Sequence, residues 1–332
     1  MVNKTAPAQK PLSAARAINI SVACLGLYLA LQVASSFGPS FVSAMMSQVL
    51  YAIGDYSTVM VMSGWISVLY SVLLFVATLV SGGLTSWIGL RLSGESLKAQ
   101  VESNQYDHSW IYKGVCMAFA MNFLLSLVVS LLNALLGIFG AGIDEVGLAT
   151  DGGFFGFLMN FASAVVLAPL FEEIVFRGVI CKSLSRFNKG FAVIFSALLF
   201  AIAHLNLYQG IPVFGMGIVF AFVYLRSGSL RVPILMHVIN NFLALVQTYS
   251  PDILSIVFLI LMLVLTVLGL YFIYKERRQF AGVFKQNSQA GMEWKLVLHN
   301  AGFWVLVVIF MAFSFLSTFG TLLLNSFGGA FY

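Results

Sequence analysis

Long apolar runs, separated by short polar stretches, dominate the chain and predict its architecture. A helix needs about 20 apolar residues to cross the hydrocarbon core of a bilayer, and about nine runs reach or approach that length. The pattern therefore predicts an all-α fold, a polytopic transmembrane helical bundle of about nine spans. These spans are expected near residues 18–37, 59–80, 114–139, 153–176, 190–206, 211–226, 232–249, 253–274 and 297–323.

The composition agrees with a membrane protein. Of the 332 residues, 60% are hydrophobic and only 9% are charged, whereas soluble proteins carry about 25% charged residues. The formal net charge of +5 is spread over short loops, so it does not indicate a nucleic-acid partner. Cys24, Cys116 and Cys181 show neither a metal-binding nor a disulfide spacing. The longest polar stretches, near 91–113 and 275–296, are too short to form a domain with its own core.

The lysine and arginine residues predict the orientation in the membrane. They fall into five groups separated by segments that contain neither residue, and the positive-inside rule places such groups in the cytoplasm. We therefore expect a multi-pass protein of the cell membrane with a cytoplasmic amino terminus and an external carboxy terminus. The groups are Lys4, Lys10 and Arg16; Arg91, Lys98 and Lys113; Arg177, Lys182, Arg186 and Lys189; Arg226 and Arg231; and Lys275, Arg277, Arg278, Lys285 and Lys295.

Two adjacent glutamates interrupt the apolar run at 153–176. Charges inside a bilayer are unfavourable, and where they occur they usually mark function. Glu173 and Arg177 are four residues apart and can pair on one helix face, whereas Glu172 is turned away by about 100°. We expect Arg177 to neutralise Glu173 and Glu172 to act as a general base for water. The pattern leaves open the reverse assignment of the two glutamates, and also an ion pair that only fixes helix packing.

Two histidines and an amide occur in later apolar helices. His237 and Asn241 share one helix face and could both donate hydrogen bonds to a developing oxyanion, or they could join membrane helices by polar contacts. His204 lies near the end of its span. At 1.5 Å per residue, His204 is about 22 Å from Lys189 and His237 is about 9 Å from Arg231. These helices must therefore start at different depths, tilt or kink if the two histidines are to meet.

Three motifs, in order and on separate apolar helices, resemble those of the CPBP family of intramembrane proteases. This family includes CAAX proteases and bacteriocin-processing proteins and is also called Abi. The resemblance implies a glutamic endopeptidase with an all-helical fold, in which Glu172 activates the attacking water with help from His204. It also implies that His237 and Asn241 bind the oxyanion, supported by Glu173 and Arg177. The motifs are Glu172-Glu173-x-x-x-Arg177, Phe200-x-x-x-His204 and His237-x-x-x-Asn241.

The likeness also divides the chain into three parts. Residues 151–250 would form a CPBP-like protease core of four helices. Residues 1–150 would form amino-terminal transmembrane helices, and residues 251–332 would form carboxy-terminal transmembrane helices. The resemblance assigns no role to these flanking helices.

The site is expected to work without a cofactor. The alternative is zinc bound by Glu172, His204 and His237, because glutamate and histidine are both zinc ligands. The expected partners are the lipid bilayer and a membrane-associated peptide or protein substrate.

The competing hypothesis is a noncatalytic membrane protein. Such a protein would give self-immunity to bacteriocins or modulate a membrane partner such as a sensor kinase. The complete set of Glu172, His204, His237 and Asn241 favours the enzyme. A protein that only binds has no need for a base and oxyanion donors in one cavity.

Overall fold

The computed structural model describes residues 12–53, 56–102, 107–138, 153–250, 254–285 and 290–328. Every regular element in these ranges is a helix, and no strand occurs in them, so the predicted all-α fold is confirmed. Two of the elements, η1 and η2, are π-helical. The elements are α1 (Ala14–Ile53), α2 (Tyr56–Ser93), α3 (Leu97–Val101), α4 (Ser109–Gly137), α5 (Gly153–Asn160), η1 (Phe161–Leu167), α6 (Ala168–Glu173), η2 (Ile174–Cys181), α7 (Lys182–Ser185), α8 (Lys189–Ile202), α9 (Leu207–Ser227), α10 (Arg231–Tyr249), α11 (Ser255–Phe284), α12 (Ala290–Leu298) and α13 (Ala301–Gly328).

Eight helices in the described part of the chain are long and apolar enough to cross a membrane, and the protein is a multi-pass membrane protein. The span expected near 190–206 is α8, which has only 14 residues. This length corresponds to about 21 Å, which is less than the roughly 30 Å of a hydrocarbon core. Because α8 is almost entirely buried among other helices, it does not need to match the thickness of the bilayer. It enters the bundle and turns back into α9.

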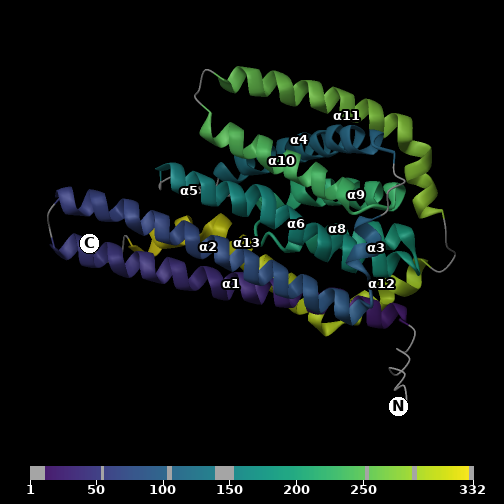
Figure 1. Ribbon diagram of the computed structural model, residues 1–332, viewed down its shortest axis with the longest axis horizontal. Helices are drawn as coiled ribbons and strands as arrows, with labels where there is room; N and C mark the ends of the chain where they lie inside the picture. The colour runs from purple at the N-terminus through teal and green to yellow at the C-terminus, as the bar shows by residue number, and fades with distance from the viewer. Residues whose placement is uncertain are drawn as a thin grey trace, which may run out of the picture.

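One long helix runs through the middle of the bundle (Figure 1). The elements from α5 to α7 join into an unbroken helix, Gly153–Ser185, of 33 residues, here called the central helix. It packs against α2 along most of its length, and against α8 and α10 on other sides. The deepest core forms where η2 meets α8 and α9, and Phe176, Phe195 and Phe220 are fully buried there.

The flanking helices pack directly on this centre. The antiparallel pair α1 and α2 lies along the central helix, α4 lies between α9 and α11, and α13 packs against α1 and α8. The loop expected between 37 and 59 is largely helical, because α1 continues to Ile53. The division of the chain into three parts stays a prediction.

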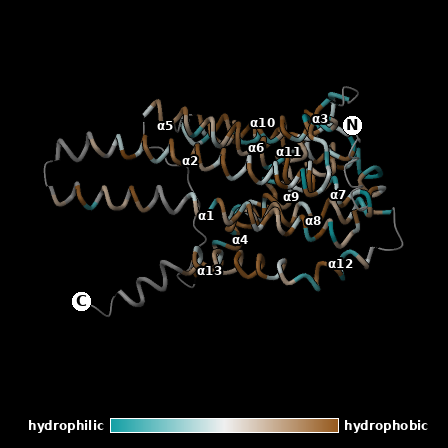
Figure 2. Tube along the Cα trace, turned by 60° about the horizontal axis from the view of Figure 1, so that its bottom comes forward, coloured by the Kyte–Doolittle hydropathy of each residue, from teal (hydrophilic) through white to brown (hydrophobic). Residues whose placement is uncertain are grey.

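Hydrophilic residues gather at the end of the bundle that holds α3, α7 and the start of α1 (Figure 2). Ion pairs tie this polar end together: Arg186 with Glu95 at 2.5 Å, and Lys113 with Glu276 at 3.3 Å. Arg177 is an exception to its predicted cytoplasmic group, because it is fully buried inside the bundle. Lys4 and Lys10 lie outside the described residues.

A buried glutamine sets the depth at which α10 begins. Gln100 lies in the polar stretch before α4, yet it is only 5% exposed. Its carbonyl accepts from the backbone N–H of Leu230, and its side chain donates to the carbonyl of Gly178 at 3.1 Å. Gly178 lies seven residues before Ser185, the end of the central helix, or about 10 Å deeper. Helix α10 therefore starts inside the bundle, and this offset accounts for the predicted depth difference between His204 and His237.

Candidate active site

The central helix widens just before the two glutamates because of a proline. Pro169 has no N–H to donate, and the N–H of Ala168 bonds to the carbonyl of Ser163, five residues back. The carbonyl of Ala164 therefore receives neither the α-helical bond from Ala168 nor a π-helical bond from Pro169. Instead, Asn241 Nδ2 donates a hydrogen bond to the Ala164 carbonyl at 2.8 Å. Wide turns of this kind occur frequently at functional sites.

Glu173 and Arg177 form the expected ion pair, with 2.8 Å between Oε1 and Nη1. Both side chains are completely buried. Arg177 Nη2 also donates to the carbonyl of Gly217 at 3.3 Å. The guanidinium carbon lies 4.5 Å from the ring centroid of Phe200 and 5.2 Å from that of Phe220. These aromatic faces and hydrogen bonds offset part of the large cost of removing two charges from water.

His237 lies between the two glutamates. Its Nδ1 is 2.9 Å from Glu173 Oε1, and its Nε2 is 3.7 Å from Glu172 Oε2. An ionised carboxylate only accepts hydrogen bonds, so the Nδ1 atom that faces Glu173 carries the hydrogen. Nε2 is then the atom of His237 that can exchange a proton or contact a substrate. The 3.7 Å separation from Glu172 is too long for a direct hydrogen bond.

Glu172 differs from its neighbour in both exposure and partners. Its side chain is 13% exposed, and no arginine or lysine in the described part of the chain forms an ion pair with it. Its Oε1 accepts a hydrogen bond from Tyr28 Oη at 3.1 Å. Gln32 Nε2 in turn donates to Tyr28 Oη at 3.3 Å. The Glu172 carboxylate is therefore oriented by a hydrogen bond from Tyr28, and not by an ion pair with an arginine or lysine of the described residues.

Tyr28 and Gln32 were missed by the sequence analysis. Both residues lie on α1, outside the three motifs. A usable signal was present, since they are polar residues four positions apart in an apolar span and therefore share a face. The same signal singled out His237 and Asn241. Sequence spacing alone could not indicate that this face of α1 meets Glu172, 144 positions away.

His204 lies in the turn between α8 and α9. Its Nδ1 is 2.9 Å from the carbonyl of Phe200, which assigns the hydrogen to Nδ1 and leaves the lone pair on Nε2 in the neutral ring. The rings of His204 and His237 both pack edge-on against Phe200, with centroids 5.1 and 5.7 Å away.

The structure thus brings five of the six candidate residues around one point. Glu172, Glu173, Arg177 and His237 are in direct or near contact, and His204 joins them across Phe200. The sixth candidate, Asn241, lies one turn beyond His237 on α10, and in this structure its amide bonds to the central helix. The chemical roles of all six residues stay predictions.

The alternative zinc site is not assembled in this structure. Among the described residues, no three His, Cys, Asp or Glu side chains are arranged so that they could hold a metal ion. Glu172 faces His237 Nε2, whereas the His204 ring lies against another side of Phe200. The absence of a cofactor stays a prediction.

Comparison with known proteins bears directly on this site. Residues 154–243 match the family model for the Type II CAAX prenyl endopeptidase Rce1-like group. The chain contains an Rce1-like CAAX-protease domain. This result confirms the family predicted from the motifs. The Rce1-like domain includes all six candidate residues, whereas Tyr28 and Gln32 lie outside it.

Two bacterial relatives are similar to the Rce1-like domain. The chain is 40% identical to the membrane-embedded CAAX protease MroQ of Staphylococcus aureus (strain USA300) over 96 residues, which cover 26% of this chain and 38% of that protein. It is 35% identical to the putative membrane peptidase YdiL of Bacillus subtilis (strain 168) over 95 residues, which cover 28% and 38%. The chain therefore matches less than two-fifths of the length of these relatives. No solved structure matches.

Proposed function

We propose that this protein is an intramembrane endopeptidase that hydrolyses a peptide bond with water activated by Glu172. Its substrate would be a membrane-associated peptide or protein. The observation that carries the proposal is the difference between two adjacent glutamates. Glu173 is fully buried and paired with Arg177, whereas Glu172 is partly exposed and lies opposite His237 Nε2. The Rce1-like domain supports the same class of reaction.

Glu172 would act as the general base. A water held between its carboxylate and a substrate carbonyl would transfer a proton to Glu172 as its oxygen attacks the carbonyl carbon. Glu172 would then return the proton to the leaving amine as the carbon–nitrogen bond breaks. Tyr28 Oη orients the carboxylate from the side through its hydrogen bond. His204, which packs against the same Phe200 ring as His237, would make a second polar contact to the same water.

His237 would stabilise the oxyanion from Nε2. In its protonated form, His237 would present an N–H on Nε2 while Nδ1 stays bonded to Glu173. A donor aimed at the developing negative charge in a buried site is strongly stabilising. Asn241 Nδ2 carries two hydrogens and donates one of them to Ala164, so its second hydrogen is the one that could reach an oxyanion.

A cleavage assay with a chelator tests the glutamate mechanism. Purified protein in detergent would be incubated with a panel of quenched peptides, with and without EDTA, beside His204→Ala. We expect cleavage that EDTA leaves unchanged and that His204→Ala lowers by about a hundredfold, within the range for loss of an acid–base group. Loss of activity with EDTA and recovery with zinc would contradict the metal-free mechanism. Failure of the wild type to cleave any peptide would favour the noncatalytic membrane protein.

The proposal also places the polar end of the bundle in the cytoplasm, because the positive-inside rule applies to its clustered lysines and arginines. Lys98 lies at this end, and its side chain is 80% exposed. The three native cysteines are all buried, so a Lys98→Cys variant would carry the one exposed thiol of the described chain. We expect a membrane-impermeant maleimide to label this thiol only after cell lysis. Equal labelling of intact and lysed cells would show that the polar end lies outside the cell, opposite to the proposed topology.

A further inference from the structure

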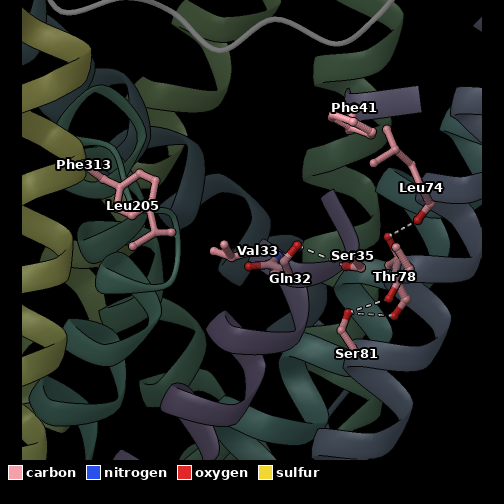
Figure 3. A pocket seen from close by; sticks show the side chains of 10 residues that line it. Gln32, Val33, Ser35, Phe41, Leu74, Thr78, Ser81, Leu205 and Phe313 are labelled. Atoms are coloured by element: carbon pink, nitrogen blue, oxygen red, sulfur yellow. Dashed lines mark hydrogen bonds between the residues drawn. The ribbon is translucent and has the colours of Figure 1, made fainter. Parts of the chain in front are cut away.

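A cavity of about 700 Å³ opens beside the candidate active site, between α1, α2 and α13 (Figure 3). This volume lies within the usual range of ligand sites. In Figure 3, Leu205 and Phe313 stand on one side, Ser35, Thr78 and Ser81 stand on the other, and Gln32 lies between them. Most of these residues lie outside the Rce1-like domain, so the flanking helices build the cavity, here called the chamber.

Two connections join the chamber to the reacting groups. Gln32 lines the chamber and donates to Tyr28 Oη, which donates to Glu172. On the opposite side, Leu205 lines the chamber and directly follows His204 in the chain. A molecule that contacts Gln32 in the chamber would therefore be two hydrogen bonds away from Glu172, and the turn that carries His204 lines the same chamber through Leu205.

Leu205 is held in an unusual backbone conformation. Its φ of 52° is positive, a region that residues other than glycine rarely adopt. Among the described residues it is the one non-glycine residue with a positive φ. Strained residues of this kind cluster at ligand and catalytic sites, where the surrounding fold maintains them. The strain lets the chain reverse between α8 and α9 while one side chain, that of Leu205, reaches the chamber.

The chamber wall combines apolar surface with hydrogen-bond acceptors. The hydroxyls of Ser35, Thr78 and Ser81 donate to carbonyls of their own helices, at 3.0, 2.9 and 2.7 Å. Each hydroxyl oxygen still has a lone pair that can accept a further hydrogen bond. A peptide backbone inside a membrane must satisfy its N–H groups, whereas a hydrocarbon chain needs no acceptor. The lining is therefore better suited to a peptide than to a lipid chain.

We propose that the chamber is the substrate-binding site for an extended, apolar peptide segment, which it delivers to Glu172 through the side lined by Gln32 and Leu205. The inference rests on the proposed endopeptidase function. It assigns the flanking helices α1, α2 and α13 a task that the Rce1-like domain does not perform. The apolar wall would contact the side chains of the segment, and the hydroxyls of Ser35 and Thr78 would accept hydrogen bonds from its backbone N–H groups.

Photo-crosslinking tests binding separately from catalysis. The full-length Glu172→Gln protein, carrying the photoreactive residue benzoylphenylalanine at Leu74, would be illuminated with a pool of biotinylated peptides of randomised apolar sequence. Leu268 of α11 provides the matched control, because it is an exposed leucine on a membrane helix that does not line the chamber. We expect labelling at Leu74 to exceed labelling at Leu268 by about tenfold, equivalent to about 1.4 kcal/mol of preference.

Filling the chamber provides the second measurement. Ala77→Trp, or Val33→Phe if the tryptophan variant does not fold, should lower labelling at Leu74 and cleavage by the otherwise wild-type enzyme by about tenfold each. Unlabelled peptide should compete for labelling, and an isoprenoid alcohol should not. Any of three results would overturn the proposal. These are equal labelling at Leu74 and Leu268, normal cleavage by a folded chamber-filling variant, and a competition experiment in which the isoprenoid alcohol reduces labelling but the unlabelled peptide does not. Cleavage that persists in Glu172→Gln would instead contradict the proposed mechanism and leave the binding result intact.

Discussion

Replacing Glu172 with glutamine is expected to reduce peptide cleavage by about a thousandfold, as for the loss of a general base, while the protein still folds. Glutamine has nearly the same shape, and its amide oxygen can still accept the hydrogen bond from Tyr28 Oη. The Glu172 side chain is 13% exposed and has no arginine partner, so its replacement leaves no buried charge unpaired. The variant should therefore accumulate in membranes and unfold at nearly the wild-type temperature.

The same substitution one residue later provides the matched control. Glu173→Gln would leave the buried guanidinium of Arg177 without a counter-charge and would weaken the hydrogen bond to His237 Nδ1. Breaking a buried ion pair in this way typically costs about 3–5 kcal/mol, so Glu173→Gln should lower the melting temperature and the yield. Cleavage rates would be expressed per folded molecule in detergent. A stable, inactive Glu173→Gln variant beside an active Glu172→Gln variant would reverse the assignment of the base.

Replacing Arg177 with methionine is expected to destabilise the protein by about 3–5 kcal/mol, an effect as large as that of Glu173→Gln. Arg177 is fully buried, and it bonds to Glu173 and to the carbonyl of Gly217. Without it, Glu173 would keep a negative charge inside an apolar bundle. Methionine fills part of the same volume, so the expected loss reflects charge and hydrogen bonding more than packing.

Arg186→Met tests whether burial decides the size of this effect. Arg186 also pairs with a glutamate, Glu95, but its side chain is 47% exposed at the polar end. The Glu95 side chain is only 5% exposed, but the arginine side chain reaches water, so we expect a loss between the roughly 0–1 kcal/mol of exposed pairs and the roughly 3–5 kcal/mol of buried ones. The double variant Glu173→Met with Arg177→Met should regain part of the lost stability, because it removes both buried charges together. Similar melting temperatures for Arg177→Met and Arg186→Met would show that the buried pair does not stabilise the bundle.

Local spacing along the chain was sufficient to predict much of the candidate site. Two opposite charges four residues apart in an apolar helix lie on the same face and can pair there. Arg177 does form an ion pair with Glu173. The length of each apolar run likewise predicted the membrane helices, because the thickness of a bilayer is nearly constant. The run near 190–206 failed this rule, since α8 is buried by other helices and meets little lipid.

The chemical context of Asn241 could not be predicted from its spacing. Its position four residues after His237 suggested two donors directed at one oxyanion, yet its amide bonds to Ala164 on the central helix. The cause is Pro169, which cannot supply the N–H that this carbonyl would otherwise receive. The proline was visible in the sequence, but its consequence depends on a helix that packs beside it.

The sequence by itself determined the membrane-spanning, all-helical class of this protein, the likeness of its Rce1-like domain and the six candidate residues within that domain. All of these depend on relations within one helix or on motifs in order along the chain. The tertiary structure alone decided how deep each helix begins and which face it turns to its neighbours. Gln100 sets the depth of α10, and Tyr28 contacts Glu172 from a distant helix. Such contacts depend on how whole helices pack, and the periodicity of a single helix carries no information about the helix beside it.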